Sequence, residues 1–155
     1  MQKKEIQIPN PILFAEVHRQ LVQGKQVKLR IRGSSMLPFI RHNDEVMLTP
    51  VHPEDIKKGS VVLAETDELG IVLHRIVEMK GNRIKLLGDG NTNQFEHTSP
   101  ERILATVSTY YRGKHILHPN HTGWRYLGIV WSWMHPWRRS LLNMVWRMKQ
   151  HLTSK

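Results

Sequence analysis

The chain has 155 residues, which is enough for one compact domain with an appendage but too few for two ordinary domains. Apolar residues make up 39% of the chain and charged residues 23%, a balance typical of a globular protein with a packed interior. The absence of cysteine excludes disulfide bonds, a thiolate nucleophile and any cysteine-based metal site.

The formal net charge of +10 is concentrated at the C-terminal end. All 13 acidic residues lie before position 121, where 17 basic residues nearly balance them, and six further basic residues follow. A basic segment can bind nucleic acid or an anionic membrane surface, and net charge alone does not choose between them. The N-terminus has no apolar run of signal-peptide length, so we expect the chain to begin in the cytosol.

The first predicted element is a helix over residues 11 to 23. Asn10 supplies a capping side chain, Pro11 suits the first helical turn, and Gly24 ends the pattern. Between them apolar residues recur at helical spacing, namely Leu13, Phe14, Val17, Leu21 and Val22. This spacing predicts an amphipathic helix.

Residues 26 to 32 alternate between apolar and polar side chains, which predicts a half-buried strand. The apolar face consists of Val27, Leu29 and Ile31. The strand runs directly into residues 33 to 38, where Gly33 and Pro38 indicate a turn.

Further strand signals continue to residue 111 and are separated by polar turns. They cover residues 45–49, 60–64, 70–77, 83–87 and 103–111. Short strands at this spacing predict a mostly β (α+β) fold, either a coiled sheet or a partly closed barrel. We expect this mostly β domain, with its leading helix, to occupy residues 1–120.

Residues 121–155, the C-terminal tail, are predicted to form a basic, tryptophan-rich amphipathic helical segment. All five tryptophans lie in the tail, and it contains no acidic residue. Its apolar stretch between Arg125 and Arg138 is shorter than the roughly 20 residues needed to cross a bilayer. The composition favours peripheral contact with the inner face of a membrane. The alternative is a helical hairpin packed on its own domain or on a partner protein.

Three separated segments carry residue types of catalytic interest: Ser35-Met36-Leu37-Pro38, His74-Arg75-Ile76-Val77 and Gly88-Asp89-Gly90-Asn91. Each alone has an ordinary explanation, because serine turns, strand histidines and polar glycine loops are common. Their order, with strands between them, resembles the type I signal peptidases and the LexA-like peptidases of the same superfamily. The resemblance covers about residues 26–110.

The resemblance implies a serine peptidase with Ser35 as its nucleophile and His74 as its general base. A serine hydroxyl needs a neighbouring base to accept its proton, and a neutral imidazole suits this task. Bacterial members and LexA-type repressors usually have lysine as the base, whereas this chain is similar to the kinds that have histidine. Asp89 is the first candidate for a carboxylate that holds the site together or orients the imidazole, and Glu96 is its rival. A turn residue is the alternative for Asp89.

The resemblance also implies that signal, leader or other precursor peptides are cleaved through an acyl-enzyme. An extended peptide would add to an exposed strand edge. Met36, Leu37 and Leu73 are candidates for the wall of a substrate pocket, and ordinary core positions are the alternative. We expect no cofactor and no metal, because the histidines lack ligand spacing and no phosphate-binding glycine loop occurs.

Two other functions are compatible with the same sequence. A catalytically inactive scaffold would bind peptides and dock on a membrane or a partner protein. A LexA-like self-cleaving regulator is disfavoured, because no helix-turn-helix precedes the peptidase segment. The basic groups of the tail accompany tryptophan instead of a recognition helix, so nucleic acid is not an expected partner.

Overall fold

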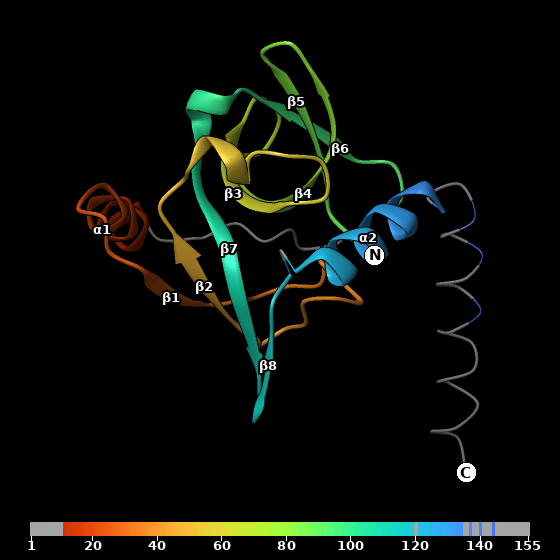
Figure 1. Cartoon of the computed structure of the whole chain (residues 1–155), viewed down its shortest axis with the longest axis horizontal. Helices are drawn as coiled ribbons and strands as arrows, with labels where there is room; N and C mark the ends of the chain where they lie inside the picture. The colour runs from red at the N-terminus through yellow and green to blue at the C-terminus, as the bar shows by residue number, and fades with distance from the viewer. Residues whose placement is uncertain (1–10, 120, 135–136, 138–139, 141–143, 145–155) are drawn as a thin grey trace.

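A curled antiparallel sheet of eight strands forms the body of the protein in the computed structural model (Figure 1). The structure describes residues 11–119, 121–134, 137, 140 and 144. The strand order is β1-β2-β7-β3-β4-β5-β6, with β8 paired to β7. In chain order the strands are β1 (Val27–Arg30), β2 (Glu45–Thr49), β3 (Val61–Thr66), β4 (Gly70–Lys80), β5 (Arg83–Leu87), β6 (Phe95–Thr98), β7 (Ile103–Arg112) and β8 (His115–Leu117).

In the described part of the chain, two α-helices flank the sheet and lie on opposite sides of it in Figure 1. They are α1 (Pro11–Val22) and α2 (Thr122–Trp133). Two short 3₁₀ turns, η1 (Pro53–Asp55) and η2 (Pro100–Arg102), precede β3 and β7. The predicted mostly β fold with a helix near each end is therefore confirmed. All six predicted strands are present, whereas β6 and β8 were not predicted.

Alternation along the central strand β3 divides the interior into two apolar clusters. Val61 and Leu63 belong to the first cluster, which also contains Val17 and Leu21 of α1. Val62 and Ala64 point to the other face and belong to the second cluster, with residues of β4, β5 and β7. Successive side chains of a strand point to opposite faces, so β3 is buried on both.

The same alternation determines where the polar residues of β4 lie. His74 has the parity of Val72 and Ile76, which belong to the second cluster. Arg75 has the parity of Leu73, which belongs to the first. Both polar side chains are almost completely buried. Each therefore needs a hydrogen-bonding partner on its own face of the sheet.

Helix α2 packs against the body of the protein through one face. Trp124 meets the buried ring of Tyr110 edge-on, with a centroid distance of 6.4 Å, and Gly128 is the buried residue of the helix. No helix in the described part of the chain is long and apolar enough to cross a membrane. The rest of the predicted helical tail lies almost entirely outside the described residues.

Candidate active site

The turn over residues 33–38, which we call the nucleophile turn because it carries the candidate nucleophile Ser35, follows β1 and brings Ser35 into the interior. Gly33 has a φ of +112°, a conformation that favours glycine, and its N–H donates to Nδ1 of His42 at 3.1 Å. Ser35 is 9% exposed, so the turn places most of this residue in the interior.

Ser35, His74 and Glu96 form one continuous hydrogen-bonded path. The Oγ atom of Ser35 lies 3.1 Å from Nε2 of His74, and Nδ1 of His74 lies 2.8 Å from Oε2 of Glu96. The imidazole and the carboxylate are both buried. A nucleophile, a base and an orienting carboxylate in this order form the arrangement that activates a serine hydroxyl.

Sheet register explains how Glu96 reaches His74. Ile76 of β4 pairs with Leu86 of β5, and Leu86 pairs with Glu96 of β6, so these three side chains share one face. His74 lies two residues before Ile76 on the same face. The long glutamate side chain spans this offset across β5.

Asp89 has a different position from the one expected of an imidazole-orienting residue, so that expectation is corrected. Its two carboxylate oxygens accept hydrogen bonds from Nε and Nη2 of Arg75, at 2.8 and 2.7 Å. The Nη1 atom of Arg75 donates to the carbonyl oxygen of Gly59 at 2.7 Å. Asp89 and Arg75 are both buried, and each neutralises the charge of the other. The carboxylate at Nδ1 of His74 is that of the rival, Glu96.

The loop over residues 88–91, which we call the GDGN loop, lies directly on the nucleophile turn. The N–H of Gly90 donates to the carbonyl oxygen of Ser35 at 2.7 Å. A Cβ atom added to Gly88 would lie 2.6 Å from that carbonyl oxygen and 3.0 Å from Nε2 of His74. Glycine therefore permits a close approach that any other residue would obstruct. The Arg75–Asp89 pair anchors this loop to β4.

The three predicted pocket residues differ in position. Met36 and Leu73 have 0% and 2% exposure and belong to the first apolar cluster, so their expected role as pocket walls is corrected to one in the core. Leu37 is half-buried in the nucleophile turn, two residues after Ser35. Its side chain therefore remains the candidate of the three for contact with a substrate.

Sequence reasoning gave no role to Arg75, although the residue lies within a recognised segment. An arginine among the apolar residues of a strand was the available signal, because a buried guanidinium needs a carboxylate or several carbonyl partners. Gly128 of α2, which lies against the guanidinium of Arg75, had no sequence signal of this kind. Among the described residues, no group of three histidine, aspartate or glutamate side chains could hold a metal ion.

Comparison with protein families identifies the same region. Residues 3–108 match the family model described as Peptidase S24-like, which covers more than half of the chain. The matched range contains Ser35, His74 and Glu96 and ends within β7, before α2 begins. A comparison with curated protein sequences gives no match. The chain therefore belongs to the Peptidase S24-like family of serine-type peptidases, within the signal peptidase and LexA-like superfamily.

Proposed function

We propose that this chain is a serine endopeptidase that cleaves signal, leader or other precursor peptides through an acyl-enzyme. The observation that carries the proposal is the buried hydrogen-bonded path from Ser35 through His74 to Glu96. Family membership supports a serine peptidase in general. In this proposal Glu96 takes the third role, and Asp89 holds the GDGN loop in place.

The geometry supports a definite sequence of proton transfers. Ser35 Oγ attacks the carbonyl carbon of the scissile bond while its proton passes to Nε2 of His74. Glu96 accepts a hydrogen bond from Nδ1–H and stabilises the imidazolium that forms. His74 then protonates the leaving amine, and an acyl group remains on Ser35. Water, deprotonated by the same imidazole, releases the acyl group and restores the hydroxyl.

The oxyanion of each tetrahedral intermediate needs a hydrogen-bond donor. Among the described residues, no acceptor is bonded to the backbone N–H of Ser35. We assign this N–H to the oxyanion, because it belongs to the nucleophile itself. The loss of one such donor typically lowers the rate of an enzyme by about 10²- to 10³-fold. An extended substrate would be held by main-chain bonds at an exposed strand edge, with Leu37 beside the side chain that precedes the cut.

The test is cleavage of a small library of precursor peptides that have alanine or glycine before the cut. The wild type should cleave a subset, and Ser35→Ala and His74→Ala should each abolish cleavage while thermal unfolding remains cooperative. Activity equal to wild type in either variant would refute the proposed pair. Peptide binding without cleavage by the wild type would favour the inactive scaffold. Loss of intact mass when the chain is incubated alone would favour a self-cleaving regulator.

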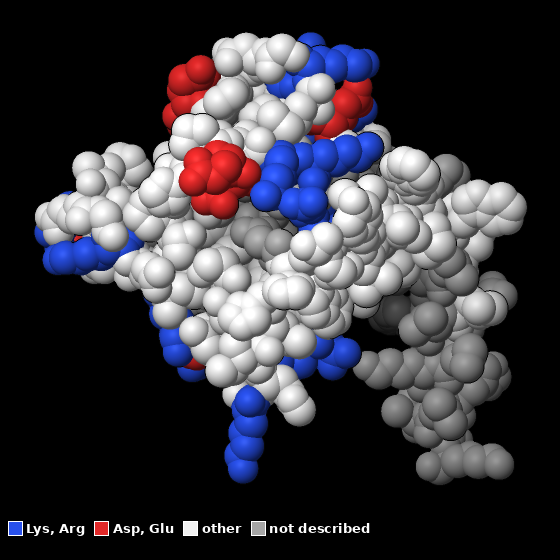
Figure 2. Space-filling view, viewed as in Figure 1, with Lys and Arg blue, Asp and Glu red and all other residues white. Residues whose placement is uncertain are grey.

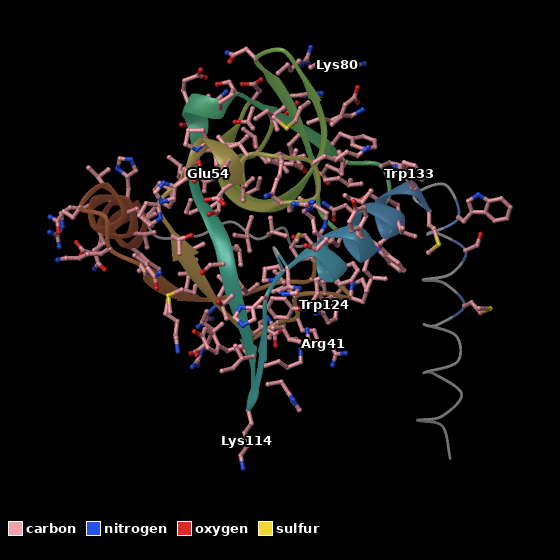
Figure 3. All side chains as sticks on the ribbon, viewed as in Figure 1. Arg41, Glu54, Lys80, Lys114, Trp124 and Trp133 are labelled. Carbon is pink, nitrogen blue, oxygen red and sulfur yellow. The ribbon has the colours of Figure 1, made fainter. Side chains whose placement is uncertain are left out.

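We further propose that the outer face of α2 contacts an anionic membrane surface. Tyr126, Val130 and Trp133 recur at helical spacing and are 58%, 52% and 73% exposed. Figure 2 shows a mostly uncharged surface over α2 with basic side chains beside it, and Figure 3 shows Trp133 at the end of the helix away from Trp124. The Arg125 guanidinium lies 5.9 Å from the Tyr126 ring centroid. The ammonium group of Lys58 lies 5.6 Å from the Trp133 ring centroid, so a cation borders this face. Tryptophan with lysine and arginine suits the interface of anionic lipids.

Sedimentation with vesicles of phosphatidylglycerol and phosphatidylcholine tests the membrane proposal. The full chain should bind vesicles, and added salt should weaken binding because screening reduces the attraction. The double variant Val130→Ser, Trp133→Ser should bind less. A matched control is Ile116→Ser, which changes an apolar residue of β8 that is 59% exposed. The proposal would be contradicted if the full chain did not sediment with the vesicles. It would also be contradicted if Ile116→Ser reduced vesicle binding as much as the double variant does.

A further inference from the structure

The inner face of α2 contacts both segments that shape the active site. The indole N–H of Trp131 donates to the carbonyl oxygen of Asp89 in the GDGN loop at 2.7 Å. The rings of Trp124 and Trp131 each meet the ring of Phe39 edge-on, with centroid distances of 6.1 Å. Phe39 directly follows the nucleophile turn. One helix face, with residues at i and i+7, therefore touches the loop and the turn together.

Gly128, between these tryptophans on the same face, lies directly on the guanidinium of Arg75. A Cβ atom added to Gly128 would lie 2.5 Å from Nη1 and 2.8 Å from Nε of Arg75, which real Cβ contacts do not permit. The ring of Phe39 lies 5.2 Å from Cζ of the same guanidinium. Asp89 and Gly59 bind its nitrogen atoms. Arg75 is thus enclosed by the body of the protein and by the backbone of α2.

A short series of contacts leads from α2 to the reacting atoms. Arg75 holds Asp89, whose neighbour Gly90 donates to the carbonyl oxygen of Ser35. On the other side of Asp89, Gly88 leaves no room for a Cβ atom against His74. The loop is therefore in contact with the nucleophile and the base at once, and a shift of Arg75 moves the loop.

We infer that α2 is a positioning element of the active site, with Gly128 and Trp131 as its positioning residues. The helix lies beyond the residues that match the family model, and the catalytic geometry of this chain depends on it. The inference rests on the proposed peptidase function for its kinetic consequence. Its structural content, that α2 holds Arg75 and the GDGN loop, does not depend on that function.

The variant Gly128→Ala tests the inference, and Gly123→Ala is its matched control in the first turn of the same helix. A Cβ atom at Gly123 meets nothing within 4 Å. Alanine has the higher helix propensity, so helix formation alone would not weaken either variant. Gly128→Ala should lower kcat by about 10-fold or more with a smaller change in KM, because small displacements of catalytic groups are costly. Gly123→Ala should match the wild type.

A second readout is the proton resonance of the His74 Nδ1–H that is hydrogen-bonded to Glu96. In Gly128→Ala this resonance should shift or broaden, and in Gly123→Ala it should not. If Gly128→Ala fails to fold, Trp131→Phe removes the indole donor to Asp89 and should give the same changes in milder form. Wild-type kcat and an unshifted resonance in Gly128→Ala would overturn the inference. If the wild type cleaves no peptide, the proposed function fails, and the resonance alone decides the role of α2.

Discussion

Glu96 is a carboxylate with no exposed surface, and within the described residues its side chain has one hydrogen-bonding partner. Its Oε2 atom is bonded to His74, and its Oε1 atom has no partner among the described residues. A buried carboxylate is costly unless an opposite charge compensates it. In the proposed mechanism, the imidazolium that forms when His74 takes the proton of Ser35 supplies that charge next to Glu96.

We predict that Glu96→Gln lowers kcat by about 10²- to 10⁴-fold, because a neutral amide cannot stabilise the imidazolium. Peptide cleavage kinetics measure the effect. Glu68→Gln is the control, since Glu68 forms a similar hydrogen bond with His97 at 2.6 Å but on the exposed surface. The control should cleave at the wild-type rate. Equal rates for wild type and Glu96→Gln would exclude a role for this carboxylate in catalysis.

Met36 and Leu37 are adjacent in the chain but are expected to have different roles, Met36 in core packing and Leu37 in substrate contact. Met36→Ala should lower the free energy of unfolding by about 2–5 kcal/mol, the usual cost of truncating a buried side chain to alanine. Leu37→Ala should cost less stability and should raise KM for peptides. Urea unfolding and cleavage kinetics measure the two effects. A raised KM in Met36→Ala without loss of stability would restore Met36 as a pocket wall.

At the scale of elements, β6 shows why the sequence did not decide between Asp89 and Glu96 as the carboxylate beside His74. Strands are recognised by apolar residues on their buried face, but the buried residues of β6 are Glu96 and Thr98. Its half-buried positions are Phe95 and His97, so the usual pattern is reversed. Because β6 was not predicted, nothing placed Glu96 opposite β5, and Asp89 in a recognised loop was named first.

The elements that were predicted have mainly apolar buried faces. The helix over residues 11–23 and the six predicted strands appear close to their expected bounds. The order of the three motifs was sufficient to single out Ser35 and His74, which the sheet brings within hydrogen-bonding distance. The contact between Gly128 and Arg75 was not predictable, since it depends on how α2 docks.

The GDGN loop depends on the Arg75–Asp89 pair, and Asp89→Asn tests that dependence. The change leaves a buried guanidinium without its counter-charge, so we expect the free energy of unfolding to fall by about 3–5 kcal/mol. Urea unfolding measures the loss. Glu16→Gln is a control that breaks the exposed ion pair with Arg19 and should change stability little. A loss no larger than that of the control would show that the pair does not anchor the loop.

For the whole molecule, the main question is whether the sheet and α2 form one folding unit. The sequence predicted a domain over residues 1–120 and a helical tail over residues 121–155, with packing of the tail on its own domain as one alternative. In the structure, however, α2 packs on Tyr110, Phe39 and the GDGN loop. These contacts are spread over three distant parts of the chain. A helix held in this way should be released when the sheet unfolds and not before.

The distribution of tryptophan makes this cooperativity measurable. All five tryptophans lie in the C-terminal tail, so tryptophan fluorescence reports on the tail, whereas far-UV circular dichroism reports mainly on the sheet. We predict coincident urea transitions by the two methods, the mark of two-state unfolding. In Gly128→Ala the fluorescence transition should move to lower urea than the dichroism transition, because the helix is displaced from Arg75. If the fluorescence transition of the wild type occurs at lower urea than its dichroism transition, α2 is an independent appendage and cannot position the site.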